Sequence, residues 1–362
     1  MREDPGNNEA GEIHALLKFV KIVLRLSLAL LCLLLLAAAV LELGIRFLTP
    51  EALAPIPMDR PTAIYAAEGS REHPHSRGAT NAWKIAIVGD SATFGSGNHR
   101  FDRFSSRLEW LLNLNDSAPP AEVEVFAKPT ATYQQEKLVR KALAWSPRIL
   151  ILSIHLNDTE DWSNAAPFVG LRRLMSDRAA PRFLRPLLRK SALLKVAWKR
   201  WQEHRQLKLA KQYYDILYDA SYTGLARFKG ALAQYRDMCR EQGVVLFAII
   251  QPLLSWDARP GHYPFEDKHR IISSVCSELG IPCTDTLEYF RYTAPIRNVD
   301  IPLADPHPSE IAHRIIADAI FNSLLESGIL PRRYIPKEQA DRALIRNWRR
   351  KFEALEIPAP RF

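Results

Sequence analysis

Cysteine is scarce in this chain, with four among 362 residues. Cys32 lies inside an apolar run, which leaves Cys239, Cys276 and Cys283. Three thiols can form at most one disulfide among them, which excludes a scaffold held together by several cross-links. Cys276 and Cys283 are close enough in sequence to pair in an oxidising compartment, and they fit equally well as two small core residues.

Other signals are also missing. No internal repeat is evident, and the histidines have no ligand-like spacing with Cys, Asp or Glu, so we predict neither a metal nor a cofactor. A charged fraction of 25% and a hydrophobic fraction of 47% are ordinary for a globular protein, which argues against disorder of the whole chain. The length leaves room for one large domain or two modest ones.

Charge is absent from residues 26–41, where Ser27 is the one polar residue. Extending the run to residues 22–45 gives a segment that spans a hydrocarbon core of about 30 Å at about 1.5 Å per residue. We predict a transmembrane anchor over 22–48. A cleaved signal peptide, with Ala37–Ala39 as a weak cleavage signal, is the competing interpretation. A buried soluble helix is a third, although such helices rarely lack a polar face over so many residues.

Basic residues flank the start of this run: Lys18, Lys21 and Arg25. By the positive-inside rule, residues 1–21 form a cytoplasmic tail, and the chain beyond the anchor lies on the far side of the membrane. We therefore predict a single-pass membrane protein with its main domain outside the cytoplasm.

The net charge of +9 is concentrated in two segments. Residues 159–220 hold 13 Lys and Arg against 6 Asp and Glu, and residues 331–362 hold 9 against 4, so the remainder of the chain is acidic. For a tethered domain, anionic headgroups or an acidic polymer are more natural partners than nucleic acid, which we do not predict as a partner.

Strand and helix signals alternate over residues 83–330. Five apolar runs predict strands, at 83–89, 123–127, 148–154, 244–250 and 281–285. Helical patterns follow at 104–114, 134–145, 271–279 and 309–327. Near-continuous apolar strands separated by helices predict a parallel sheet covered on both faces, a three-layer α/β/α sandwich of the flavodoxin-like kind.

The remaining segments surround or interrupt this domain. Residues 49–82 lack a sustained period and are rich in Pro and polar residues, which is typical of a linker. Residues 159–220 are a long basic helical insertion, and 331–362 a basic C-terminal extension. Leu and Trp residues among the charges of 171–217 are compatible with a helix on a membrane surface or with an amphipathic helix packed on the domain.

A chemical motif stands where the first predicted strand ends: Gly89-Asp90-Ser91-Ala92-Thr93-Phe94-Gly95. Ser91 is thereby placed at the carboxyl edge of the sheet, where open α/β folds hold their sites. The helix start that follows offers backbone N–H groups to an oxyanion. Thr93 occupies the second glycine position of the G-x-S-x-G elbow, so the α/β-hydrolase family fits poorly.

The segment resembles the first block of SGNH/GDSL hydrolases, GDSxTxG. The third block of that family, G-x-N-D, is matched in part by His155-Leu156-Asn157-Asp158 after the third predicted strand. The resemblance implies that Asn157 donates a side-chain N–H to the oxyanion. His155 replaces the glycine of the block, and we interpret it as a loop histidine beside the site rather than a catalytic one.

The fifth block of the family carries the general base and precedes the last helix. Here it reads Ala304-Asp305-Pro306-His307-Pro308, so His307 matches the histidine of D-x-x-H-P while Ala304 replaces the usual aspartate. Asp305 instead resembles the D-x-H variant of some members, including polysaccharide O-acetyltransferase relatives. A carboxylate is needed to orient the imidazole, and Asp305 is the candidate.

The second block is the weakest match, because the donor glycine aligns with Thr132. Its backbone N–H would complete an oxyanion hole with Asn157 and the N–H of Ser91, although a side chain there restricts the approach of substrate. The resemblance covers roughly residues 83–158 and 244–327.

The resemblance implies a membrane-anchored serine esterase with Ser91, His307 and Asp305 as catalytic residues. Its substrate would be an acylated small molecule, glycan or lipid. An O-acyltransferase that modifies an envelope polysaccharide is the alternative within the family. Two other classes stay open: a degenerate carbohydrate-binding domain, which the replaced glycines favour, and a membrane scaffold, which the basic segments favour.

Overall fold

The computed structural model describes residues 6–48, 81–95, 98, 102–115, 118–161, 171, 174, 183–254, 256, 262–290 and 307–335. The chain divides into two compact units. Unit 1 combines Met1–Ile56 with Met175–Lys208, and unit 2 combines Pro57–Leu174 with Leu209–Phe362. Part of the predicted basic insertion therefore groups with the N-terminal helix.

Unit 2 is built on a parallel sheet of five strands. The strands are β1 (Trp83–Gly89), β2 (Ala121–Ala127), β3 (Ile149–Ile154), β4 (Val245–Ile250) and β5 (Cys283–Asp285). Their order is β2-β1-β3-β4-β5, which confirms the predicted flavodoxin-like sheet. The order reverses beside β1, so the carboxyl ends of β1 and β3 meet at the switch point where such sheets hold ligands.

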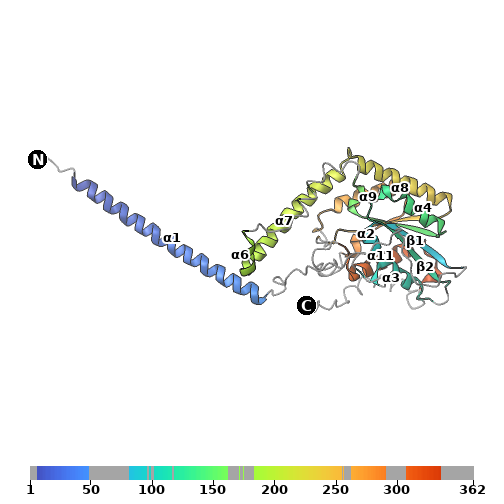
Figure 1. Cartoon of the computed structure of the whole chain (residues 1–362), viewed down its shortest axis with the longest axis horizontal. Helices are drawn as coiled ribbons and strands as arrows, with labels where there is room; N and C mark the ends of the chain where they lie inside the picture. The colour runs from blue at the N-terminus through green and yellow to red at the C-terminus, as the bar shows by residue number, and fades with distance from the viewer. Residues whose placement is uncertain are drawn as a thin grey trace. The chain divides into compact units, whose positions relative to one another are not determined.

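Helices cover both faces of the sheet (Figure 1). On one side lie α4 (Glu136–Ala144), α8 (Thr223–Glu241) and α9 (Glu266–Glu278), and on the other α3 (Phe104–Leu112) and α11 (Glu310–Glu326). The predicted three-layer sandwich is thereby confirmed. The helix predicted over 104–114 ends two residues early, because Asn113 turns back to bond Ala121, the first residue of β2.

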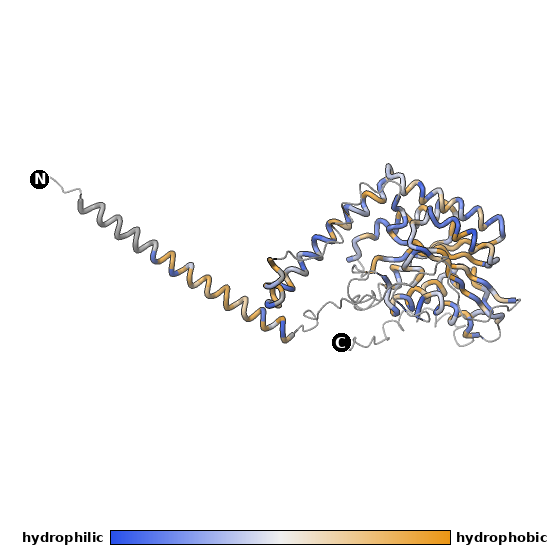
Figure 2. Tube along the Cα trace, viewed as in Figure 1, coloured by the Kyte–Doolittle hydropathy of each residue, from blue (hydrophilic) through white to orange (hydrophobic). Residues whose placement is uncertain are grey.

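The central strands are apolar because both of their faces are covered. Every residue of β3 is buried, as are six of the seven residues of β1. Figure 2 shows these strands as the hydrophobic centre of the unit. Burial of apolar side chains yields about 25 cal/mol of transfer free energy per Å², and this is the main force that assembles the layers.

Unit 1 contains the long helix α1 (Gly6–Leu48), followed much later in the chain by α6 (Arg185–Lys190) and the start of α7 (Ala192–Leu217). Within α1, Lys21–Phe47 is long and apolar enough to cross a membrane, with a mean hydropathy of 2.7 and none of its most apolar window buried. This segment coincides with the predicted anchor. The predicted linker 49–82 falls outside the described residues, apart from 81 and 82.

The four cysteines are free thiols. Cys276 lies on α9 and Cys283 on β5, and a hydrogen bond between the two thiols, together with burial, raises the pKa of Cys283 well above its usual value. The close pairing of α9 with β5 accounts for this contact.

Candidate active site

The nucleophile motif forms a tight turn from β1 into the one-turn helix α2 (Ser91–Phe94). Asp90 is the N-cap of α2, and its Oδ1 accepts hydrogen bonds from the backbone N–H groups of Ala92 (3.0 Å) and Thr93 (3.3 Å). These N–H groups have no carbonyl partner at a helix start, so a capping carboxylate stabilises the turn. Ser91 is therefore held as the first residue of the helix, half-buried at the sheet edge.

Both glycines of the motif have a steric reason. A Cβ on Gly89 would lie 2.1 Å from Oγ1 of Thr93, whose side chain folds back over the strand end. Gly95 ends α2 with φ +72°, a left-handed conformation that glycine adopts without strain, and its N–H bonds the carbonyl of Ala92. The two glycines thus allow the tight turn that positions Ser91.

His307 meets Ser91 across the sheet edge, with 2.9 Å between Nε2 and Oγ. The two residues that follow His307 are each held by a hydrogen bond. Ser309 caps α11 by accepting from the N–H of Ala312 (3.3 Å), and the side chain of Asn98 donates to the carbonyl of Pro308 (2.7 Å). The structure therefore brings together the predicted nucleophile and the predicted base, 216 residues apart.

Asn157 lies on the short 3₁₀ helix η4 (Leu156–Thr159), directly after β3 and half-exposed. Because β1 and β3 are parallel neighbours, Asn157 and Ser91 follow the same edge of the sheet. His155 and Asp158, on either side of Asn157, are bonded to each other twice. The N–H of Asp158 donates to the backbone carbonyl of His155 at 3.0 Å, and the carboxylate of Asp158 accepts from the N–H of His155 at 2.8 Å.

His155 is buried beside the site, with its Nε2 4.0 Å from Oδ1 of Asp90. Burial lowers the pKa of His155, an effect that the charge of His307 adds to and that of Asp90 opposes. The interpretation of His155 as a loop histidine rather than a catalytic residue stays a prediction.

Thr132 begins the 3₁₀ helix η3 (Thr132–Gln134) and is fully buried. Its carbonyl accepts from the hydroxyl of Tyr235 at 2.7 Å, which fixes the start of η3 under α8. Elements η3 and η4 are in contact, so Thr132 and Asn157 lie on neighbouring short helices.

Asp305, the predicted orienting carboxylate, falls outside the described residues. Asp90 is the acidic residue next to the nucleophile, but its Oδ1 is engaged in capping α2. The described part of the site thus contains a dyad of Ser91 and His307.

Buried polar residues near the same sheet edge escaped the sequence analysis. The side chain of Gln251, after β4, donates to Ser153 of β3 at 2.6 Å. His269 of α9 lies between Asp285 (Nδ1 to Oδ1, 2.8 Å) and the hydroxyl of Tyr263 (Nε2 to Oη, 3.2 Å). Single histidines and tyrosines without a motif give no signal in a sequence, and only the fold shows them as partners.

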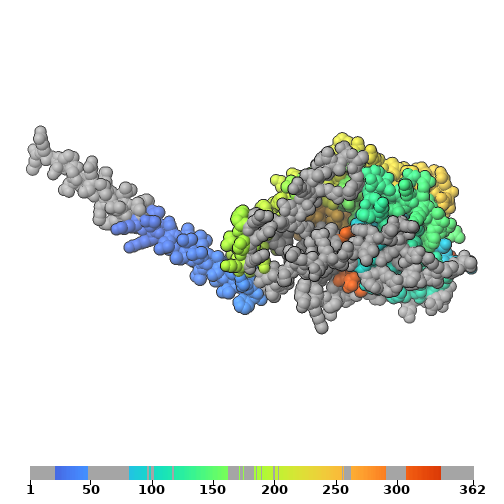
Figure 3. All heavy atoms as spheres, in the orientation of Figure 1, coloured from blue at the N-terminus to red at the C-terminus, as the bar shows by residue number. Residues whose placement is uncertain are grey.

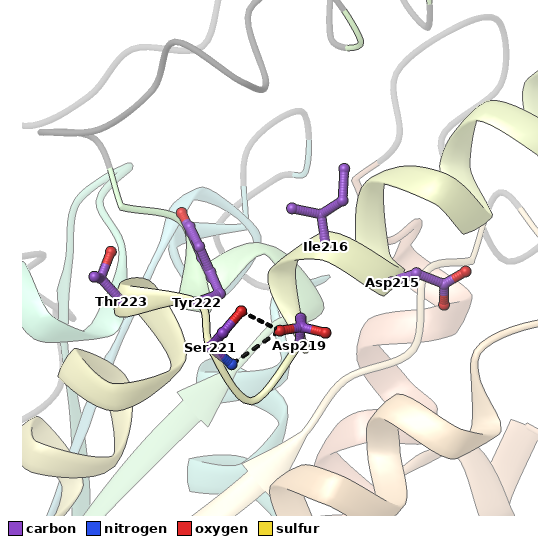
Figure 4. Close-up of a pocket in the computed structure, with 6 residues that line it drawn as sticks. All are labelled: Asp215, Ile216, Asp219, Ser221, Tyr222 and Thr223. Carbon is purple, nitrogen blue, oxygen red and sulfur yellow. Dashed lines mark hydrogen bonds between the residues drawn. The ribbon is translucent and has the colours of Figure 1, made fainter.

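A surface cavity of about 440 Å³ lies where α7 meets α8 (Figure 4). It is lined by Asp215, Ile216, Asp219, Ser221, Tyr222 and Thr223. Figure 4 shows the hydroxyl and N–H of Ser221 directed at Asp219. Both donate to Oδ1 of Asp219, at 2.5 and 2.9 Å. None of the predicted site residues lines this cavity. Among the described residues there is also no cluster of His, Cys, Asp and Glu that could hold a metal ion.

Comparison with known proteins gave structural likenesses only. No family model matches the chain, and no curated protein does. Solved structures of similar fold include a catalytic mutant of Axe2, an acetylxylan esterase from Geobacillus stearothermophilus (13% identity, 67% of this chain, 93% of that chain, TM-score 0.42). A second is the acetyl xylan esterase AlAXEase (14% identity, 67% of this chain, 99% of that chain, TM-score 0.41).

A third similar structure is a protein of the G-D-S-L family from Desulfitobacterium hafniense (13% identity, 67% of this chain, 99% of that chain, TM-score 0.37). These neighbours are esterases or bear the name of the class that the sequence motifs resemble. Similarity at this level does not indicate the substrate of this chain. The function is therefore inferred from the geometry around Ser91.

Proposed function

We propose that this chain is a membrane-anchored serine esterase that hydrolyses carboxylic esters through an acyl-enzyme on Ser91. The observation that carries the proposal is the 2.9 Å contact between Oγ of Ser91 and Nε2 of His307. A nucleophile within hydrogen-bond reach of a base is the signature of covalent acyl transfer.

In the proposed reaction, His307 takes the hydroxyl proton while Oγ of Ser91 attacks the ester carbonyl. The tetrahedral oxyanion is held by the N–H of Ser91, the side chain of Asn157 and the N–H of Thr132. Collapse of the intermediate breaks the C–O bond to the alcohol, which receives the proton from His307. Water, deprotonated by His307, then releases the acid and restores Ser91. Asp305 is assigned to orienting His307 and stabilising its charged form.

The substrate class follows from the anchor. Lys21–Phe47 can span a bilayer, and basic residues precede it, so we infer a cytoplasmic N-terminus and an active site outside the cytoplasm. Acylated glycans and lipids are the esters available at such a surface. A reporter fused after Phe362 should register as extracytoplasmic, and the protein should resist carbonate extraction. A cytoplasmic reporter would overturn this part of the proposal.

The test of the chemistry is turnover of p-nitrophenyl acetate by the purified chain. Ser91→Ala should lower kcat by roughly 10⁴-fold or more, as loss of a catalytic serine does elsewhere. Ser221→Ala, a change at an exposed serine on another surface, is the matched control and should be silent. Equal rates for wild type and Ser91→Ala would leave the carbohydrate-binding interpretation standing instead.

Transfer of the acyl group to a glycan hydroxyl would begin with the same acyl-enzyme. The two outcomes are separated by supplying an acyl donor with and without polysaccharide acceptors, and following the acyl group by mass spectrometry. Hydrolysis predicts free acid in both samples. Donor consumption that depends on the acceptor, with little free acid, would replace hydrolysis by transfer.

A further inference from the structure

Glu42 is the one acidic residue of the segment Lys21–Phe47. An ionisable side chain within a membrane-spanning segment is costly, and such residues are kept where a specific partner offsets the cost. In unit 1 the partner of Glu42 is a second helix, 150 residues further along the chain.

The carboxylate of Glu42 caps the N-terminus of α7. It accepts from the backbone N–H groups of Ala192 (2.6 Å) and Leu193 (2.7 Å) and from the hydroxyl of Ser191 (2.8 Å). The first N–H groups of a helix have no internal acceptor and carry partial positive charge, so a carboxylate stabilises them. Here the cap is supplied by another helix, and the bonds are charge-assisted.

Arg46, one turn after Glu42, completes the joint. Its Nε donates to Glu42 at 2.9 Å, and its terminal nitrogen donates to the carbonyl of Lys190, the last residue of α6, at 2.6 Å. The last turns of α1 therefore hydrogen-bond both the end of α6 and the start of α7. Figures 1 and 3 show α6 and the first turns of α7 against the end of α1.

This joint fixes the depth of the corner. Phe47 ends the apolar segment five residues after Glu42, about 7.5 Å along the helix at 1.5 Å per residue. If Lys21–Phe47 spans the bilayer, α6 and the first turns of α7 therefore lie at its surface.

The residues placed there have an interfacial composition. Phe183, Leu187, Leu194 and Trp201 are large apolar side chains exposed by 76%, 52%, 41% and 51%. Residues 183–202 contain six Lys and Arg and no Asp or Glu. Exposed aromatic and leucine side chains among basic residues are what helices at an anionic bilayer surface present. We name residues 183–202 the collar.

We propose that the collar binds the anionic lipid headgroups of the leaflet where α1 emerges, and that Glu42 is the residue that positions it there. The proposal rests on the proposed membrane anchor. It also revises the sequence interpretation of one amphipathic helix. The helix breaks at Ser191, and the exposed apolar residues lie just before α6 (Phe183), on α6 (Leu187) and on the first turns of α7 (Leu194 and Trp201).

The experiment uses the full chain with a photoreactive benzoyl-phenylalanine, reconstituted in phosphatidylcholine vesicles with and without phosphatidylglycerol. The probe replaces Leu187 or Trp201 in the collar. Leu33, within the apolar segment, is the positive control, and the exposed Trp110 of α3 is the negative control. We expect lipid adducts from both collar positions and from Leu33, stronger for the collar when phosphatidylglycerol is present, and few from Trp110.

Glu42→Ala should lower the yield of lipid adducts at the collar positions by roughly fivefold, the change expected for loss of a helix cap. The yield at Leu33 should stay unchanged. If lipid adducts form at Leu33 but the yields at the collar positions are no higher than at Trp110, the anchor is supported and the proposal for the collar is overturned. Loss of Leu33 adducts would remove the anchor and the proposal together. Adducts that shift from lipid to an added soluble acidic polysaccharide would also contradict the assignment to lipid.

Discussion

Two carboxylates in this molecule cap the N-terminus of a helix, in two different regions. Asp90 accepts two backbone N–H bonds at the start of α2, and Glu42 accepts two at the start of α7. Asp90 caps the helix that follows it directly, whereas Glu42 caps a helix 150 residues away. One cap shapes a turn around the proposed nucleophile, and the other joins two segments of unit 1.

A helix cap stabilises only one turn of backbone, yet its loss can affect a distant part of the molecule. Loss of Asp90 should disturb the position of Ser91, because Ser91 is the first residue of the capped helix. Loss of Glu42 should release the collar and leave the dyad in unit 2 intact. The variants below separate these consequences.

Among the variants that leave Ser91 and His307 in place, the largest effect is expected from Asn157→Ala, which tests the chemistry that the Asp90 turn serves. Removal of one oxyanion donor typically lowers kcat by about 10²–10³, roughly 3–4 kcal/mol, with KM nearly unchanged. Steady-state kinetics on p-nitrophenyl acetate measures both constants. Asn115→Ala, a change at a surface asparagine bonded to Arg333 and Ile335, is the control. A larger change in KM than in kcat would instead make Asn157 a substrate-binding residue.

Gly95→Ala tests whether the turn that carries Ser91 has room for a side chain. An alanine at φ +72° costs about 1 kcal/mol in backbone strain, and its Cβ would lie 2.6 Å from the side chain of Arg103, so a total of about 2 kcal/mol is expected. Gly243 is a matched control, since it has φ +67° and open space around it. Urea unfolding should therefore show a greater loss for Gly95→Ala than for Gly243→Ala. Equal losses would mean that the turn has room for a side chain.

His313 of α11 makes the core next to the dyad sensitive to acid. Burial, together with the charges of His307 and His155, lowers its pKa to about 3. Below the unfolded value of about 6.5 the unfolded chain binds a proton that the folded chain does not, so stability is complete above that pH and falls as pH falls. The slope is about 1.4 kcal/mol per pH unit between the two pKa values.

The variant His313→Gln keeps an acceptor for the N–H of Phe104 and removes this titration. The difference in unfolding free energy between wild type and variant should shrink as pH is lowered from 7 to 5, in urea titrations at each pH. A difference that does not depend on pH would show that His313 has the same pKa in the folded and the unfolded protein.

The smallest effects come from breaking the two caps themselves. Asp90→Ala should destabilise unit 2 by about 1 kcal/mol and lower esterase turnover, whereas Asp90→Asn, which keeps an acceptor oxygen, should lose less of both. Glu42→Ala should leave turnover of a soluble ester unchanged. A drop in turnover for Glu42→Ala that matched the drop for Asp90→Ala would merge the two regions into one functional unit.

The sheet and the dyad were predictable from sequence for physical reasons. Strands buried on both faces must be apolar throughout, so runs such as 148–154 stand out, and β3 indeed occupies Ile149–Ile154. The motif at Gly89–Gly95 is readable because its requirements are local: a cap, a packed threonine and a left-handed glycine within seven residues.

The remaining features depend on contacts between distant segments. Nothing in the sequence near Glu42 indicates that Ser191 is its partner. His269 and Asp285 likewise belong to different elements that only the packing of α9 on β5 brings together. A periodic pattern shows which face of an element is buried, but not which residue of another element it meets.

Reaction with a fluorophosphonate probe tests whether Ser91 is a nucleophile activated by His307. The full chain should form one adduct, located on the peptide that contains Ser91 by mass spectrometry. The adduct should be absent in Ser91→Ala and strongly slowed in His307→Ala, because the hydroxyl then loses its base. A folded wild-type protein in which Ser91 remains unlabelled, or is labelled equally fast without His307, would contradict the account.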